Sequence, residues 1–123
     1  MALHVDVRWL LERQAEVLSK EPSVHDFSGL VAPVARHRVN TPRLDCTADS
    51  AWRAAVLFHE IASVRPLPTR NALSGALVAV AYMAASGEAV DTPYGALSDL
   101  AKQVRAGRTD VYACADQIRR WRI

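Results

Sequence analysis

A chain of 123 residues is long enough to bury one sizeable core, and we expect a single domain over residues 1–123. Half of its residues are hydrophobic and 23% are charged, as in ordinary globular proteins. The net charge of +2 is too small to indicate a nucleic-acid partner, because phosphate backbones are bound by clustered cations.

The cysteines and the apolar stretches are typical of a cytoplasmic protein without a membrane span. Cys46 and Cys114 are far apart and lack metal-ligand spacing, so we expect both to be reduced and inert. The first residues lack the basic and apolar regions of a signal peptide. The most apolar stretch, residues 72–86, carries no charge but is shorter than the roughly 20 residues of a membrane span, which favours a core helix.

Hydrophobic periodicity predicts two helices in the first third of the chain, over residues 6–19 and 27–37. Asp6 can cap the first helix, and Pro22 ends that apolar run. Pro33 lies inside the second helix. Three residues of the second helix are expected to face the core: Leu30, Val31 and Val34.

A short flap is expected over residues 38–45, which lack helical periodicity and contain Pro42. The third helix is predicted to begin near Thr47 and to end before Pro66 and Pro68. Its inner side is expected to carry Trp52, Ala55, Val56, His59, Ile61 and Ala62.

The fourth helix is predicted over residues 69–86, with Gly87 at its carboxyl end. It is apolar or small on every side, so we expect the other helices to surround it. Four residues are expected to form its buried stripe: Leu73, Leu77, Val80 and Ala84.

Two shorter helices complete the expected all-α fold of six helices. Thr92 is predicted to cap the fifth, with Pro93 in its first turn and Gly107 after its end. Thr109 is predicted to cap the sixth. Their apolar positions are Leu97, Leu100 and Val104 in the fifth helix and Val111, Cys114 or Ala115, Ile118 and Trp121 in the sixth.

The segment that leads into the fourth helix is the best candidate for a site. The first backbone N–H groups of a helix are unpaired and its dipole is positive there, which favours an anion. Arg65 and Arg70 add two cations at this point, and Asn71 adds an amide. A plainer interpretation stays open, in which Thr69 only caps the helix and both arginines are solvated.

The remaining polar residues suggest little chemistry. The four histidines have no metal-ligand spacing, so no metal site is predicted. His59 is either a satisfied core histidine or a weak candidate for a catalytic base. Arg38 and Arg43, on the expected flap, are candidate contacts to a target protein or simply solvated cations.

Several stretches, taken together in their order, carry a resemblance to a known family. They are HVDV at residues 4–7, LFHEIA at 57–62, ASGEAV at 85–90, and AG at 106–107 followed by a final amphipathic helix ending in RRW. The chain resembles the Fic/Doc (Fido) family over almost its whole length, especially the short toxin-type members. The resemblance implies a Fic/Doc-like bundle around a central helix.

The resemblance also implies a chemistry. In the family, a loop with the signature His-Pro-Phe and the start of the next helix hold nucleotide phosphates and Mg²⁺. The histidine deprotonates a hydroxyl of a target protein, which then attacks a phosphate. This implies transfer of AMP, or of phosphate onto a translation factor, together with an antitoxin partner encoded nearby.

The signature is largely replaced in this chain. Arg65 stands at the histidine position, Thr69 at the metal-binding acid and Leu73 at the phosphate-gripping arginine, whereas Asn71 matches the family asparagine. An arginine cannot act as a general base at neutral pH. Without the acid, Mg²⁺ is not expected to bind in the family manner.

The predicted function is therefore that of a catalytically altered or inactive relative of the toxins. It would bind a phosphate-bearing ligand, such as ATP or another nucleotide, or a partner protein. Two alternatives stay open: a working toxin enzyme, with His59 as the nearest candidate base, and a purely structural partner of an antitoxin-like helix.

Overall fold

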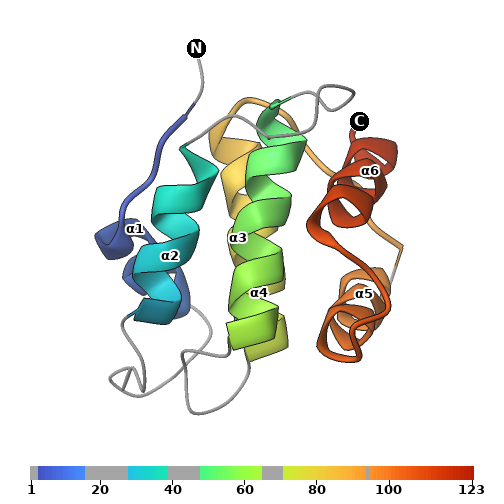
Figure 1. Cartoon of the computed structure of the whole chain (residues 1–123). Helices are drawn as coiled ribbons and strands as arrows, with labels where there is room; N and C mark the ends of the chain where they lie inside the picture. The colour runs from blue at the N-terminus through green and yellow to red at the C-terminus, as the bar shows by residue number, and fades with distance from the viewer. Residues whose placement is uncertain (1–2, 16–27, 39–47, 65–70, 94) are drawn as a thin grey trace.

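A computed structural model of the chain describes residues 3–15, 28–38, 48–64, 71–93 and 95–123. These residues contain six α-helices, which confirms the all-α class (Figure 1). The helices are α1 (Val7–Ala15), α2 (Ser28–His37), α3 (Ser50–Val64), α4 (Asn71–Ala85), α5 (Ala96–Arg105) and α6 (Val111–Trp121). None of them combines the length and the apolarity needed to cross a membrane.

The central helix of the bundle is α3, and the expectation that the fourth helix holds this place is wrong. Every residue from 51 to 58 in α3 is buried, as are Ile61 and Ala62. Helices α2, α4, α5 and α6 all contact α3, and Figure 1 shows it between α2 on one side and α6 on the other. The core is therefore built around α3.

The expected buried stripe of α4 is also wrong. Leu73 is 53% exposed and Val80 is 37% exposed, Ala84 is exposed and Leu77 is only half-buried. The residues of α4 that are buried instead are Asn71, Ser74, Gly75, Val78, Ala79, Tyr82 and Met83.

Close helix packing explains which face of α4 is buried. A Cβ atom built on Gly75 would lie 3.3 Å from the carbonyl oxygen of Phe58 on α3, so the two backbones approach closely at this point. The small residues Gly75, Ser74 and Ala79 on the buried face permit this close approach. Because α4 has no charged side, its sequence pattern did not distinguish the two faces.

Three of the expected helix ends are confirmed. The Oδ1 atom of Asp6 accepts a hydrogen bond from the Trp9 N–H at 2.9 Å and so caps α1. Gly87 has a φ of 83° directly after α4, and Gly107 has a φ of 71° after α5. A positive φ favours glycine, so both residues end their helices as predicted.

Three other helix starts differ from the expectation. Helix α3 begins at Ser50 and is capped by Asp49, whose Oδ1 accepts from the Trp52 N–H at 2.9 Å. Asp110, and not Thr109, caps α6. Helix α5 begins at Ala96, after Gly95, so Thr92 does not cap it. In the first two cases an aspartate side chain provides the cap, and in the third the chain makes a further turn before the helix.

Helix α2 matches its expected bounds but not all of its expected inner side. Leu30 and Val34 are buried, four residues apart on one face, while Val31 is 54% exposed. Pro33 is buried inside α2. Residues 16–19 of the first predicted helix and 39–45 of the predicted flap lie outside the described residues.

Candidate functional site

The predicted anion site falls mostly outside the described residues. Arg65, Thr69 and Arg70 are not among them, and neither is Arg43 of the expected flap. Asn71 is described: it is the first residue of α4 and is 8% exposed. The structure therefore places only Asn71 of the four candidate anion-binding residues, at the expected end of the helix.

A hollow of about 400 Å³ lies at the end of α3 that leads toward α4. Its described lining consists of Ser63 from the last turn of α3 and Lys102, Arg105 and Ala106 from the end of α5. In Figure 1 the end of α3, the start of α4 and helix α5 lie toward the same end of the bundle. The hollow is thus close in sequence to the candidate loop, since Ser63 precedes Arg65 by two residues.

The two cations give the hollow a positive lining. Lys102 and Arg105 are exposed and lie three residues apart, on one side of the last turn of α5. Neither forms an ion pair with any residue that the structure describes, whereas Arg36 and Arg119 are paired. Unpaired cations beside a hydroxyl can bind a phosphate or carboxylate.

The sequence-based prediction missed these lining residues. Lys102 and Arg105 are basic residues in the last turn of an amphipathic helix, a pattern that usually only complements the helix dipole. The signal that could have found them is their spacing of three residues. Their placement beside Ser63 depends on the contact between α3 and α5, which the sequence pattern does not give.

His59 is half-buried on α3, one turn before Ser63. Burial lowers the pKa of its imidazole below 6.5, and Arg36 lowers it further, while Glu60 and Asp110 act in the opposite direction. The ring is therefore neutral at pH 7 and able to accept a proton. This state fits both earlier interpretations, a core histidine and a weak base.

Arg38 follows α2 directly and contacts the segment before α1. Its Nη2 atom donates a hydrogen bond to the Val5 carbonyl oxygen at 3.1 Å, so it holds the segment before α1. Val5 itself is 4% exposed and belongs to the core. In the described structure Arg38 anchors this segment, and its contact to a target protein stays a prediction.

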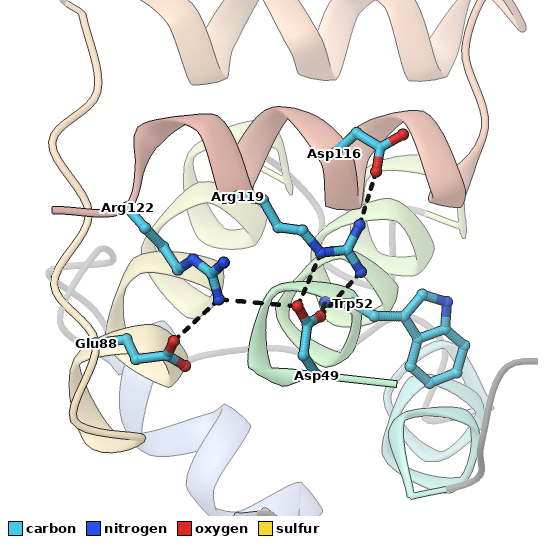
Figure 2. A network of polar contacts seen from close by, with 6 residues as sticks. All are labelled: Asp49, Trp52, Glu88, Asp116, Arg119 and Arg122. Carbon is cyan, nitrogen blue, oxygen red and sulfur yellow. Dashed lines mark hydrogen bonds and ion pairs between the residues drawn. The ribbon is translucent and has the colours of Figure 1, made fainter. Parts of the chain in front are cut away.

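At the opposite end of the bundle (Figure 1), a polar network joins the start of α3 to the end of α6 (Figure 2). Arg119 donates to both carboxylate oxygens of Asp49, at 2.8 and 2.9 Å, and to Asp116 at 2.7 Å. Arg122 lies 3.0 Å from Glu88 and 3.8 Å from Asp49. Every charge in this network has an opposite partner, which is typical of a structural element.

The electrostatics of Asp49 follow from this network. Burial alone would raise the pKa of its carboxyl group, but hydrogen bonds from Arg119 and the Trp52 N–H, together with the charges of Arg119 and Arg122, outweigh that effect. The pKa therefore lies below 3.8. Asp49 stays charged at neutral pH and serves as both helix cap and ion-pair partner.

The part of the chain that the structure describes offers neither a cluster of metal ligands nor a reactive thiol. Those residues contain no group of three His, Cys, Asp or Glu side chains arranged to hold a metal ion. Cys114 is buried in α6, and burial raises the pKa of its thiol to about 12. Such a thiol is unreactive at neutral pH, whereas Cys46 lies outside the described residues.

The solvent side of α4 presents an uncharged surface, which we call the outer face of α4. It is formed by Leu73, Ala76, Leu77, Val80, Ala81 and Ala84. Helices α1 and α5 contact α4, but these six residues remain half-buried or exposed. Contiguous apolar surface on a small protein is typical of a protein–protein contact.

In comparisons with known proteins, the chain matches no family model and no curated protein sequence.

Proposed function

We propose that this chain is a Fic/Doc-like protein of the toxin–antitoxin type, catalytically altered or inactive. In this proposal it binds a phosphate-bearing ligand where α3 ends and α4 begins, or it binds a partner protein. The family assignment rests on the ordered resemblance of the sequence, with Asn71 as the one retained signature residue that the structure describes.

The hollow beside the end of α3 is the observation that carries the proposal. It is large enough for a phosphorylated small molecule, and Ser63, Lys102 and Arg105 supply one hydroxyl and two cations. Arg65 and Arg70 follow Ser63 in the sequence and add further positive charge to the same part of the chain. Phosphate recognition through arginine and lysine needs no metal ion.

The outer face of α4 supports the partner half of the proposal. Within this account, an antitoxin-like protein would cover its uncharged residues, of which Leu73 and Val80 are the most exposed large ones. The alternative of a purely structural partner of an antitoxin-like helix differs from this proposal in one respect: it requires no ligand in the hollow.

An active transferase is the second candidate function, and one observation favours it. His59 is neutral at pH 7 and lies one turn from Ser63, so it could accept a proton near the hollow. Arg65 at the position of the family base argues against this candidate.

Calorimetric titration with ATP, with and without Mg²⁺, and with inorganic phosphate tests the proposal. We expect dissociation constants from high micromolar to millimolar, since a charged hydrogen bond contributes about 1.5–3 kcal/mol net. The affinity should fall as the salt concentration rises. The double variant Lys102→Ala with Arg105→Ala should bind ATP at least about tenfold more weakly.

A matched control removes the same charge elsewhere. Arg8 and Arg120 are exposed, and each contacts a residue of its own helix, Glu12 and Gln117 respectively. Arg8→Ala with Arg120→Ala should bind ATP as the parent does. Equal binding by parent and by the Lys102 and Arg105 variant would contradict a ligand site in the hollow.

A further inference from the structure

The segment before α1 is fastened to the rest of the bundle by three polar contacts to its backbone. The Val5 N–H donates to Nε2 of His37 at 3.0 Å. Arg38 donates to the Val5 carbonyl oxygen at 3.1 Å, and the Tyr82 hydroxyl donates to the Leu3 carbonyl oxygen. The segment thus depends on α2 and its end through His37 and Arg38, and on α4 through Tyr82.

The hydrogen bonds of His37 fix its protonation state. Its Nε2 atom accepts from the Val5 N–H, so this nitrogen carries no proton. Its Nδ1 atom bonds to the Val34 carbonyl oxygen, which can only accept, so Nδ1 carries the proton. The ring is the neutral tautomer with the proton on Nδ1.

A protonated ring is incompatible with this arrangement. Both nitrogens of an imidazolium are donors, so Nε2–H would face the Val5 N–H and the hydrogen bond would be lost. Both His37 and Val5 are buried, at 0% and 4% exposure, so water cannot replace the lost partner without movement of the segment.

Among the residues that the structure describes, the groups around His37 offer an imidazolium no compensating charge. The segment contributes the ring of His4, 5.8 Å from that of His37, and α4 contributes the ring of Tyr82, at 6.0 Å. Arg38 follows α2, and Arg53 of α3 donates to the His37 carbonyl oxygen.

The two described carboxylates on the neighbouring segments of the chain have other partners. Asp6 is exposed and caps α1, and Glu88 pairs with Arg122. Burial first, and then His4 and Arg38, lower the pKa of His37 below 6.5, although its backbone hydrogen bonds act in the opposite direction. The neutral ring is therefore the stable form in the closed arrangement.

We propose that residues 3–6 and α1 form a latch that is closed when His37 is neutral and opens when acidification protonates its ring. Opening would release Val5 and Leu10 from the core. It would also uncover the side of α4 that α1 contacts, next to the outer face of α4. The latch therefore couples pH to the amount of apolar surface that α4 presents.

Amide hydrogen exchange of Val5, followed by NMR in the intact chain, tests the latch. An amide whose opening is independent of pH exchanges about tenfold more slowly for each unit that the pH falls. If protonation of His37 drives opening, the opening constant rises by up to about tenfold per unit between pH 6.5 and the lowered pKa of the closed form, and then levels off. In that pH range the two effects largely cancel, so the Val5 exchange rate should change little as the pH falls just below 6.5.

Two variants separate His37 from other titrating groups. In His37→Gln, the amide oxygen can accept from the Val5 N–H without titrating, so the tenfold decrease per pH unit should return. His59→Gln removes the other histidine with a lowered pKa and should behave as the parent. A tenfold decrease per unit in the parent would overturn the proposal, whether or not the glutamine variant folds. So would ring ¹⁵N shifts that place the proton of His37 on Nε2.

Discussion

Arg119 near the end of α6 and Asp49 at the start of α3 form a two-pronged ion pair, with both carboxylate oxygens engaged at 2.8 and 2.9 Å. The side chains of both residues are about one-fifth exposed, so solvent screens the pair only in part. The same carboxylate caps α3 through the Trp52 N–H. One side chain thus fixes the start of the central helix and its connection to α6.

Separate removal of the two roles of Asp49 should have graded effects on the free energy of unfolding. Asp49→Ser keeps a capping oxygen but loses the ion pair, and we expect a loss of about 1–2 kcal/mol. Asp49→Ala loses both roles and should cost about 2–3 kcal/mol. Denaturant unfolding followed by tryptophan fluorescence measures both, with Arg120→Ala as a control that should stay within about 0.5 kcal/mol of the parent. Equal stabilities of the serine and alanine variants would contradict the capping role.

The acid dependence of stability follows from the same pair. The pKa of Asp49 is lowered in the folded chain, so its contribution is present above pH 3.8 and is lost as the pH falls further. His37 and His59 also have lowered pKa values, so their contributions are present above pH 6.5 and decline below it. The free energy of unfolding should therefore decrease in two separate pH ranges, one below pH 6.5 and one below pH 3.8. Arg119→Ala should weaken only the decrease below pH 3.8.

Substitutions on α4 should distinguish its two faces. Leu73→Lys and Val80→Lys lie on the outer face and should change stability by no more than about 0.5 kcal/mol. Val78→Ala removes buried atoms against α3 and should cost about 1–2.5 kcal/mol. Thermal or denaturant unfolding measures these values. A large loss with both lysine variants, and none with Val78→Ala, would restore the orientation first predicted from the sequence.

Transfer chemistry of the family type should be absent. Incubation with ATP labelled on the α- or γ-phosphate, Mg²⁺ and a cell lysate should leave proteins unlabelled, because Arg65 cannot act as a base. Arg65→His alone should not restore labelling, since Thr69 and Leu73 still replace the metal ligand and the second arginine. Strong Mg²⁺-dependent labelling by the parent would contradict this prediction. If His59→Gln abolished that labelling, His59 would be the base.

The sequence pattern was sufficient for the helices but not for their arrangement. The hydrophobic period, the cap Asp6 and the glycines after α4 and α5 indicated six helices, because these signals act within a few residues. The central position of α3 could not be predicted, because α4 is the more apolar helix and its closest packing depends on Gly75 against Phe58. Hydrophobicity indicates that a helix is buried against other helices. The size of the side chains at the contact decides which face of the helix is buried.

In the candidate site, too, the sequence predicted local features but not the contacts between helices. Asn71 was placed at the start of α4 from local signals, and the structure agrees. Lys102 and Arg105 were not predicted, because only the packing of α5 on α3 brings them beside Ser63. The role of His37 was also missed, because residues 32 positions apart form its hydrogen bond to Val5. Such contacts are products of the fold and have no local signature.

Backbone NMR during a titration with ATP tests the proposed ligand site most directly. The account predicts progressive, salt-sensitive shifts of the amides of Ser63, Asn71, Lys102, Arg105 and Ala106. The amides around Asp49 and Arg119, on the other side of the molecule, should stay unchanged. An unchanged spectrum at about 10 mM ATP, well above the expected dissociation constant, would contradict the account, as would shifts confined to the Asp49 and Arg119 region.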